Sequence, residues 1–196
     1  MDLLYLLRSL LRKKWIIILC TITGLAAGYV LFTLRPREYV SLAQYSTGFT
    51  MEQKVKINPE ENYNLYEIDI RFNNVNVAFA SEKVQAMVSY KLLLYDLEDA
   101  TPFRQLTEKK KKEKAFLNAD LNRAKKILRE KITSLQLLTS YNKDEKMVID
   151  LLDLYDYTNE ELVKHLSLKR VEHTDFINIF ANSENPHLSA FMANTA

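Results

Sequence analysis

Cysteine, glycine and histidine are scarce in this chain of 196 residues, which contains one, three and three of them respectively. The single thiol, Cys20, excludes a disulfide within the chain, so cysteine usage does not indicate the redox compartment. The three histidines are scattered, and their spacing does not indicate a metal or catalytic cluster. The net charge of +2 lacks the strongly basic balance of nucleic-acid-binding proteins, so we expect no nucleic-acid partner.

The signature motifs of common enzymes are also missing. Neither G-x-S-x-G nor H-E-x-x-H nor a glycine-rich phosphate loop occurs in the sequence. Asp150, Asp153 and Asp156 recur at every third position, but no glycine turn closes them into a calcium-binding EF-hand loop. We interpret these aspartates as an acidic solvent face. We predict that the protein is not an enzyme and has no cofactor or metal.

Charged residues are absent from Trp15 to Leu34. At ~1.5 Å per residue, a helix of this length rises about 30 Å, which is the hydrocarbon thickness of a bilayer. A cleaved signal peptide is the alternative, but its apolar core is usually ~7–15 residues long and is followed by small residues. Here the bulky Phe32 and Pro36 take that place. The sequence therefore predicts a transmembrane helix over 15–34.

Basic residues flank this segment unequally, with four between Arg8 and Lys14 and two, Arg35 and Arg37, after it. The positive-inside rule then predicts that residues 1–14 are cytoplasmic and that the domain formed by 35–196 lies outside the cytoplasm. The first residues are interpreted either as a short amphipathic helix on the inner membrane surface or as an extension of the spanning helix.

Two of the three glycines, Gly24 and Gly28, form a G-x-x-x-G pattern inside the apolar segment. Together with Ala27 they make a strip of small residues along which a second helix could approach closely. Small residues are also common in spanning helices that face only lipid. The sequence leaves both interpretations open, a helix–helix contact and plain lipid exposure.

Residues 35–196 alternate between strand and helix signals, which predicts an α+β fold, a mixed α/β domain with long helices. Strands are expected over 39–46, with a turn at Gly48, and over 168–181. Residues 50–66 are expected to form an exposed loop. Two strands make a thin mixed sheet, so we expect another chain segment or a neighbouring subunit to complete it.

Apolar residues at intervals of three and four predict several helices. The first follows a cap at Asn73 or Asn74, and the last has Asn185 as its N-cap and Pro186 at its first helical position. A T-x-x-E capping box that starts at Thr158 opens a short helix. The expected helical ranges are 75–94, 107–138, 144–154, 158–166 and 185–196.

Lysine dominates the longest of these predicted helices. Lys109, Lys110, Lys111 and Lys112 are consecutive, and residues 108–131 contain ten basic residues against four acidic ones, a net charge of about +6. Such a density of positive charge attracts an anionic polymer or lipid head groups. A solvated helix face is the alternative, and the sequence does not decide between them.

The order of these features resembles the Wzz-type chain-length determinants, the polysaccharide co-polymerases, including their GumC-like and Wzc-like forms. In that family a basic cytoplasmic stretch and a spanning helix lead directly into a strand. A late strand, a polar turn, a proline and a helix follow. The residues that carry the resemblance here are Pro36, Tyr39, Thr174, Asp175, Pro186 and Asn194, within segments 35–39, 44–48, 81–84, 174–179, 183–186, 188–191 and 193–194.

The resemblance implies a protein of the bacterial inner membrane with its main domain in the periplasm. Members of the family assemble into rings and set the length or promote the export of exopolysaccharide, capsule or O-antigen, together with a polymerase or an outer-membrane exporter. Some carry a cytoplasmic tyrosine kinase, but this sequence has no Walker-type motif. The family also has a second spanning helix, so we expect this sequence to be part of a longer chain.

A membrane-bound sensor shares the plan of a spanning helix followed by an extracytoplasmic input domain. Only about 14 residues precede the predicted span, which are too few for an output domain on that side. We therefore favour a non-enzymatic scaffold that forms homo-oligomers and contacts polysaccharide through Lys109–Lys112. The sensor input domain is the alternative function.

Overall fold

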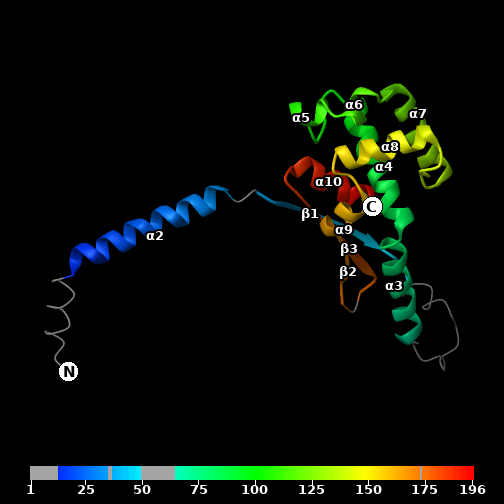
Figure 1. Ribbon diagram of the computed structural model, residues 1–196. Helices are drawn as coiled ribbons and strands as arrows, with labels where there is room; N and C mark the ends of the chain where they lie inside the picture. Colours follow the sequence, from blue (N-terminus) through cyan, green and yellow to red (C-terminus); the bar gives the residue numbers. More distant parts are fainter. Residues whose placement is uncertain (1–12, 35–36, 50–64, 173) are drawn as a thin grey trace. The chain divides into compact units, whose positions relative to one another are not determined.

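The computed structural model describes residues 13–34, 37–49, 65–172 and 174–196 (Figure 1). The chain divides into two compact units at Arg37 and Glu38. The first unit contains one described helix, α2 (Lys14–Leu34), and the second is a mostly helical α/β unit with one small sheet. This confirms the predicted fold class of an apolar N-terminal helix followed by a mixed α/β unit.

Helix α2 is long and apolar enough to cross a membrane, with a mean hydropathy of 2.1 over Lys14–Thr33. None of that span is buried against the rest of the chain. Three threonine hydroxyls of α2 donate to backbone carbonyls of the preceding turn, an arrangement that suits an apolar environment. These bonds run from Thr21 to Ile17, Thr23 to Leu19 and Thr33 to Tyr29.

The sheet has three strands, β1 (Tyr39–Ser46), β2 (Leu166–Arg170) and β3 (Phe176–Ser183), in the order β1-β3-β2. Both pairs are antiparallel. The prediction of β1 is confirmed residue for residue. The expected further strand is supplied by the chain itself, as β2, whereas the prediction of a mixed sheet is wrong, because all three strands are antiparallel to their neighbours. The predicted single strand over 168–181 is a hairpin, because the chain reverses between Arg170 and Phe176.

Nothing in the sequence of this hairpin turn marks a reversal, since it contains neither glycine nor proline. The turn is held by side-chain bonds instead. The Thr174 hydroxyl donates to the Val171 carbonyl over 2.8 Å, and the Phe176 N–H donates to the Thr174 oxygen over 3.2 Å. Gly48, after β1, has the positive φ of 68° expected of a turn glycine.

The helix predicted over 75–94 is two helices, α3 (Leu65–Phe79) and α4 (Glu82–Glu98). Ser81 separates them as the N-cap of α4, with its hydroxyl accepting from the Val84 N–H at 3.4 Å. The predicted caps, Asn73 and Asn74, lie inside α3. Helix α3 starts earlier than predicted because the buried Ile68 and Phe72 pack against Ile177 of the sheet, which overrides local capping preference. Residues 65–66, predicted as loop, therefore belong to α3.

The prediction of one long helix over 107–138 is also wrong. The segment forms three helices, α5 (Glu108–Lys111), α6 (Lys114–Leu117) and α7 (Leu121–Ser134). Asp120 starts α7 by accepting hydrogen bonds from the N–H groups of Asn122 and Arg123, and a capping carboxylate at this place competes with a continuous helix. Leu135 ends α7 in the left-handed conformation, at a φ of 52°.

The last three helices agree with the prediction. They are α8 (Lys143–Leu154), α9 (Asn159–His165) and α10 (Pro186–Thr195). Asn185 caps α10 as predicted, since its side chain accepts from the His187 N–H at 2.9 Å. Thr158 occupies the N-cap of α9, but its side chain makes no capping bond, so the predicted capping box is not formed.

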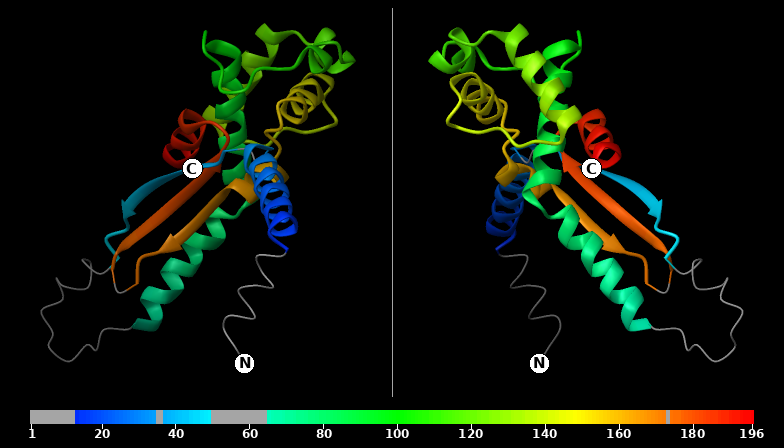
Figure 2. Two further views of the ribbon diagram at one scale, coloured as in Figure 1. Left: turned by 90° about the vertical axis from the view of Figure 1, so that its left-hand side faces the viewer. Right: turned by 90° about the vertical axis from the view of Figure 1, so that its right-hand side faces the viewer.

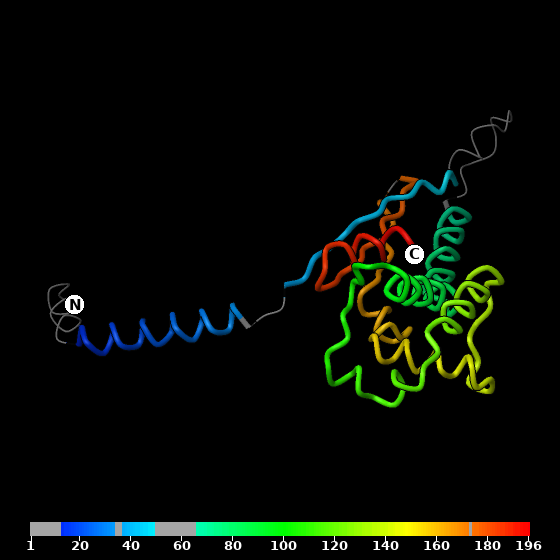
Figure 3. Tube along the Cα trace, turned by 90° about the horizontal axis from the view of Figure 1, so that it is seen from above, coloured from blue at the N-terminus to red at the C-terminus, as the bar shows by residue number. Residues whose placement is uncertain are grey.

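One core unites the helices with one face of the sheet. Leu92 of α4, Leu128 of α7, Leu151 of α8 and Leu188 of α10 have no exposed surface, and the core continues to Ile179 of β3. Figure 3 shows α4 in green between α7 and the red α10. Helix α10 packs on β1 and β3 on this inner face of the sheet, and α3 packs beside β2 through Ile68 and Phe72. Figure 2 shows α4 continuing from α3 beyond the end of the sheet.

Replacing Leu92 by Ala should lower the free energy of unfolding by roughly 2–5 kcal/mol. Leu92 is fully buried, and the substitution leaves a cavity that the surrounding helices fill only in part. Urea unfolding followed by circular dichroism measures the change. Leu117→Ala is the matched control, because Leu117 is 68% exposed and should shift the midpoint little. Equal effects of the two substitutions would contradict this core.

Candidate functional site

The lysine run forms α5 and the turn after it, and the structure divides its members by role. Lys110 is half-buried, and its Nζ lies 2.6 Å from the Leu154 carbonyl and 2.7 Å from the Asp156 carboxylate. Lys111 pairs with Glu108 of its own helix at 3.0 Å. Lys110 therefore fastens α5 to the end of α8 and is not free to meet a polymer.

Lys109 and Lys112 differ from these two, because both are exposed and neither contacts a carboxylate among the described residues. Lys114, at the start of α6, is exposed as well. Free ammonium groups on a segment that is held at one point make a polyanion contact feasible. Of the predicted contact residues, Lys109 and Lys112 are thus available in the structure, and the exposed Lys114 adds a third charge next to them.

A buried polar cluster anchors the neighbourhood of this lysine segment. Asp96, near the end of α4, accepts hydrogen bonds from the Tyr157 hydroxyl at 2.6 Å, the Phe103 N–H at 2.7 Å and the Arg104 N–H at 3.2 Å. Burial raises the pKa of Asp96 and the three donors oppose that rise. Burial and the nearby Asp96 charge raise the pKa of Tyr157, which keeps its hydroxyl protonated as a donor.

Arg104 extends the cluster to two further segments. Its guanidinium donates to the carbonyls of Tyr155 and Asp156, at 3.0 and 2.7 Å, and pairs with Glu184 at 2.9 Å. It also lies 4.8 Å from the centre of the Tyr157 ring. The cluster joins the end of α4, the turn after α8 and the connection from β3 to α10. No sequence pattern marked Asp96 or Arg104, because their partners are distant in the chain.

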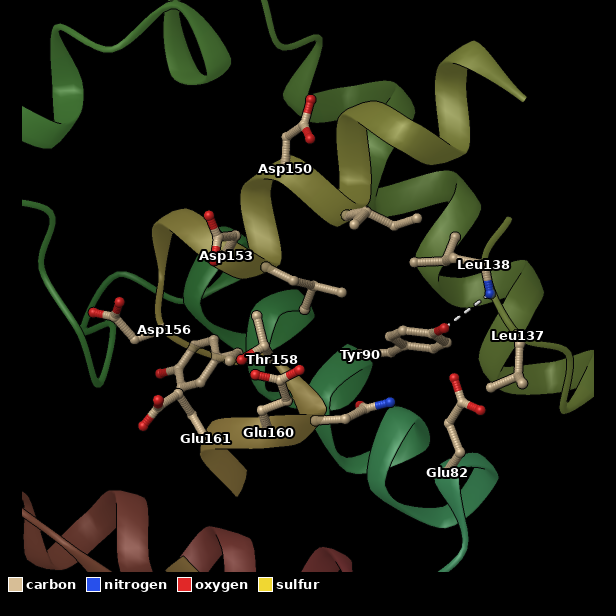
Figure 4. Close-up of a pocket in the computed structure, with 14 residues that line it drawn as sticks. Glu82, Tyr90, Leu137, Leu138, Asp150, Asp153, Asp156, Thr158, Glu160 and Glu161 are labelled. Carbon is tan, nitrogen blue, oxygen red and sulfur yellow. Dashed lines mark hydrogen bonds between the residues drawn. The ribbon is translucent and has the colours of Figure 1, made fainter. Parts of the chain in front are cut away.

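The predicted aspartate face lies on a pocket of about 830 Å³. Asp150, Asp153 and Asp156 border it together with Glu82, Glu160 and Glu161, and Figure 4 shows these carboxylates around an opening. Tyr90 lies at one side of the pocket, where its hydroxyl accepts from the Leu138 N–H at 2.9 Å. No set of three His, Cys, Asp or Glu side chains in the described part of the chain is arranged to hold a metal.

The residues that carry the family resemblance lie at the two ends of the sheet. Tyr39 begins β1 and pairs with Ser183, just before Pro186 starts α10, and Asn194 is exposed near the end of that helix. Thr174 and Asp175 lie in the β2–β3 turn, where the Asp175 carbonyl accepts from the Thr47 N–H at 2.8 Å. Pro36 lies outside the described residues.

Gly24 and Gly28 lie on α2 with open space around them. A Cβ added at either position would meet no atom within 4 Å. The strip of small residues is thus accessible to another helix, and the helix–helix contact stays a prediction.

Comparison with known proteins adds no relative. No family model, no curated protein and no solved structure matches this chain. A function therefore has to be argued from the arrangement described above and from the resemblance in the order of the sequence features.

Exchanging Lys110 for Gln should destabilise the domain by about 1 kcal/mol. The change removes two short bonds at a half-buried site, and a net hydrogen bond contributes ~0.5–1.5 kcal/mol. The double variant Lys109→Gln, Lys112→Gln should stay within about 0.5 kcal/mol of wild type, since both side chains are exposed. Urea denaturation compares them. A larger loss in the double variant than in Lys110→Gln would refute this division of roles.

A second ion pair gives the domain a defined pH dependence. Lys131 of α7 and Glu145 of α8 lie 3.1 Å apart, and both side chains are 13% exposed. Burial alone would raise the pKa of Glu145, but the Thr139 N–H, Lys131 and the Thr139 hydroxyl lower it below its usual value. A carboxyl with a lowered pKa in the folded state stabilises the fold above its unfolded pKa of about 4.3.

Wild type and Glu145→Gln should therefore differ in stability at pH 7 and converge as the pH falls. The stabilisation by Glu145 is complete above about pH 5 and disappears as the carboxylate is protonated through its lowered pKa. Thermal unfolding midpoints between pH 7 and pH 3 measure the difference. A gap between the two proteins that stays constant down to pH 3 would show that the Glu145 charge does not matter.

Proposed function

We propose that this protein is a membrane-anchored polysaccharide co-polymerase, an oligomeric scaffold that controls the chain length or export of a surface polysaccharide. In this proposal α2 spans the bacterial inner membrane, the N-terminus is cytoplasmic and the α/β unit is periplasmic. The protein works without a cofactor and catalyses no reaction itself. Its partners are other copies of the chain, a polymerase or outer-membrane exporter, and the polysaccharide.

The observation that carries this proposal is the pairing of β1 with β3. Only residues 35–38 separate α2 from β1, and β1 pairs along its whole length with β3. Strand β3 then leads into α10, which starts at Pro186 behind the Asn185 cap. The early and late segments that resemble the co-polymerases, around β1 and around β3 with α10, thus pack together in one structural unit. This contact supports the resemblance, because the two segments would belong to the same part of a co-polymerase fold.

The exposed lysines supply the polymer contact in this proposal. Lys109, Lys112 and Lys114 present positive charge on a segment fixed through Lys110. Many surface polysaccharides carry carboxylate or phosphate groups, and a short row of ammonium groups holds such a chain weakly and without sequence preference. Weak, repeated contact suits a protein that measures or guides a polymer without cutting it.

A sensor input domain is the second candidate, favoured by the pocket of about 830 Å³. Pockets of this size accommodate small ligands in other proteins. The gene neighbourhood separates the two proposals, because glycosyltransferase genes favour the co-polymerase and a histidine kinase gene favours the sensor.

The polymer ladder of living cells tests the co-polymerase proposal. In cells that lack the gene, the wild-type gene should restore the normal distribution of polysaccharide lengths on a gel. The variant Lys109→Gln, Lys112→Gln should shift that distribution at normal protein levels, because the polymer contact loses two charges. Tyr141→Gln is the control, since Tyr141 is 99% exposed elsewhere. A ladder that is the same with and without the gene would sink the proposal.

A further inference from the structure

The outer face of the sheet carries exposed apolar side chains that no described residue buries. Alternate residues point to each face, and the inner residues Ala43, Ile177 and Ile179 are buried by the helices. The opposite face carries Val40, 64% exposed, and Leu42, 56% exposed, with Phe180 beside them. Phe176 lies at the far end of this face, beyond the Gln44 and Asn178 side chains, which are hydrogen-bonded at 3.0 Å. Leu42 lies directly across from Phe180 in the pairing of β1 with β3.

Charge is nearly missing from this outer face. Among the outward-pointing residues of the three strands, Lys169 alone is charged, and its Nζ lies 5.6 Å from the centre of the Phe180 ring. Carboxylates lie beyond the ends of the face instead, at Glu38, Glu172 and Glu184. Apart from Lys169 and the apolar residues, the outward positions are uncharged and polar, and include the hydrogen-bonded Gln44 and Asn178. A surface with apolar and aromatic residues, little charge at its centre and polar residues around them is typical of a protein interface. Carboxylates at both ends disfavour an anionic lipid surface.

Helix α3 presents a second uncovered apolar surface. One side of the helix is buried through Ile68 and Phe72. Tyr66, Ile70 and Val77 follow at the spacing of a second stripe, and they are 74%, 41% and 71% exposed. A helix with apolar stripes on two sides is normally covered on both.

These two surfaces cannot cover each other within one chain. The inner side of α3 packs against Ile177 on the inner face of the sheet through Ile68 and Phe72, so the stripe on the opposite side of the helix points away from that face. The outer face of the sheet lies on the other side of the same layer. Each surface can therefore be covered by its counterpart only from another copy of the chain.

We propose that the outer stripe of α3 in one copy, Tyr66, Ile70 and Val77, packs on the outer sheet face of the next copy, centred on Leu42 and Phe180. The lengths match, because 15 residues of helix rise ~22 Å and 8 residues of strand extend ~26 Å. The contact adds a helix layer to the open side of the sheet. It rests on the proposed homo-oligomer and names its interface.

A contact between two different surfaces has a consequence for the form of the assembly. Each added copy leaves one stripe and one sheet face free, so the contact repeats and closes into a ring when the rotation permits. Packing of two sheet faces on each other would instead stop at a dimer.

Cysteine cross-linking in the full-length protein tests the contact. Cys20→Ser removes the only thiol of this sequence, and Leu42→Cys with Ile70→Cys then places one thiol on each surface. In membranes, a short bismaleimide should convert this double variant into a ladder of dimers, trimers and larger species. Either cysteine alone should give no ladder. Leu42→Cys with Tyr141→Cys is the matched control and should also give none.

Mass measurement in mild detergent gives the second readout. Val77→Lys should reduce the assembly to smaller species than wild type, whereas Val163→Lys, on the exposed part of α9, should keep the wild-type mass. Both residues are exposed in a single chain, so both variants should fold, which circular dichroism checks.

The outcomes separate the interface from the proposed function. A wild-type oligomer with no cross-linked ladder and an unchanged Val77→Lys mass refutes this interface and leaves the homo-oligomer intact. Dimers from Leu42→Cys alone refute it in favour of sheet-to-sheet packing. Protection of Leu42→Cys from an impermeant maleimide without any ladder refutes it in favour of lipid or a different protein. A wild-type monomer at every concentration refutes the homo-oligomer itself.

Discussion

The pairing of β1 with β3 is the constraint on which the rest of the unit depends. It joins Tyr39 to Ser183 and continues over all eight residues of both strands, so about two thirds of the chain, residues 47–175, lies between two paired segments. Closing such a loop is entropically costly, and it is offset by the core that the intervening helices bury on one face of the sheet. Both ends of the domain are therefore fixed together, and the helices between them can vary without separating the ends.

The buried polar cluster around Asp96 has a comparable role at the other end of the unit. The helices α5 and α6 are only four residues each and bury no residue fully, so they have little packing of their own. Their position depends on the turn after α8, which Arg104 and Lys110 hold through its carbonyls. Asp96 in turn fixes the backbone of Arg104. Arg104 and Lys110 thus hold the lysine segment in place. The exposed lysines of that segment are therefore not needed for folding.

Local signals were sufficient for β1, α8 and α10, because alternation, an N-cap and a proline act within a few residues. These local signals failed where contacts between residues distant in the sequence determine the structure. The hairpin after Arg170 has no turn residue, and α3 continues through Asn73 because the sheet buries its neighbours. The division of the lysine run was also hidden, since the partner of Lys110 lies 46 residues away. The sequence thus predicted which segments are present better than which side chains are free.

The outer face of the sheet stays open because this small unit has too few helices to cover both faces. Three strands have two faces, and helices α3 and α10 both pack on the inner one. Antiparallel sheets tolerate one solvated face, but that face is then usually polar. Here Val40 and Leu42 stay exposed, and covering them within the chain would need another helix. In the proposed assembly a second copy supplies that helix in α3, whose outer stripe is exposed in the single chain. In the proposed assembly, the two apolar surfaces that are exposed in the monomer cover one another.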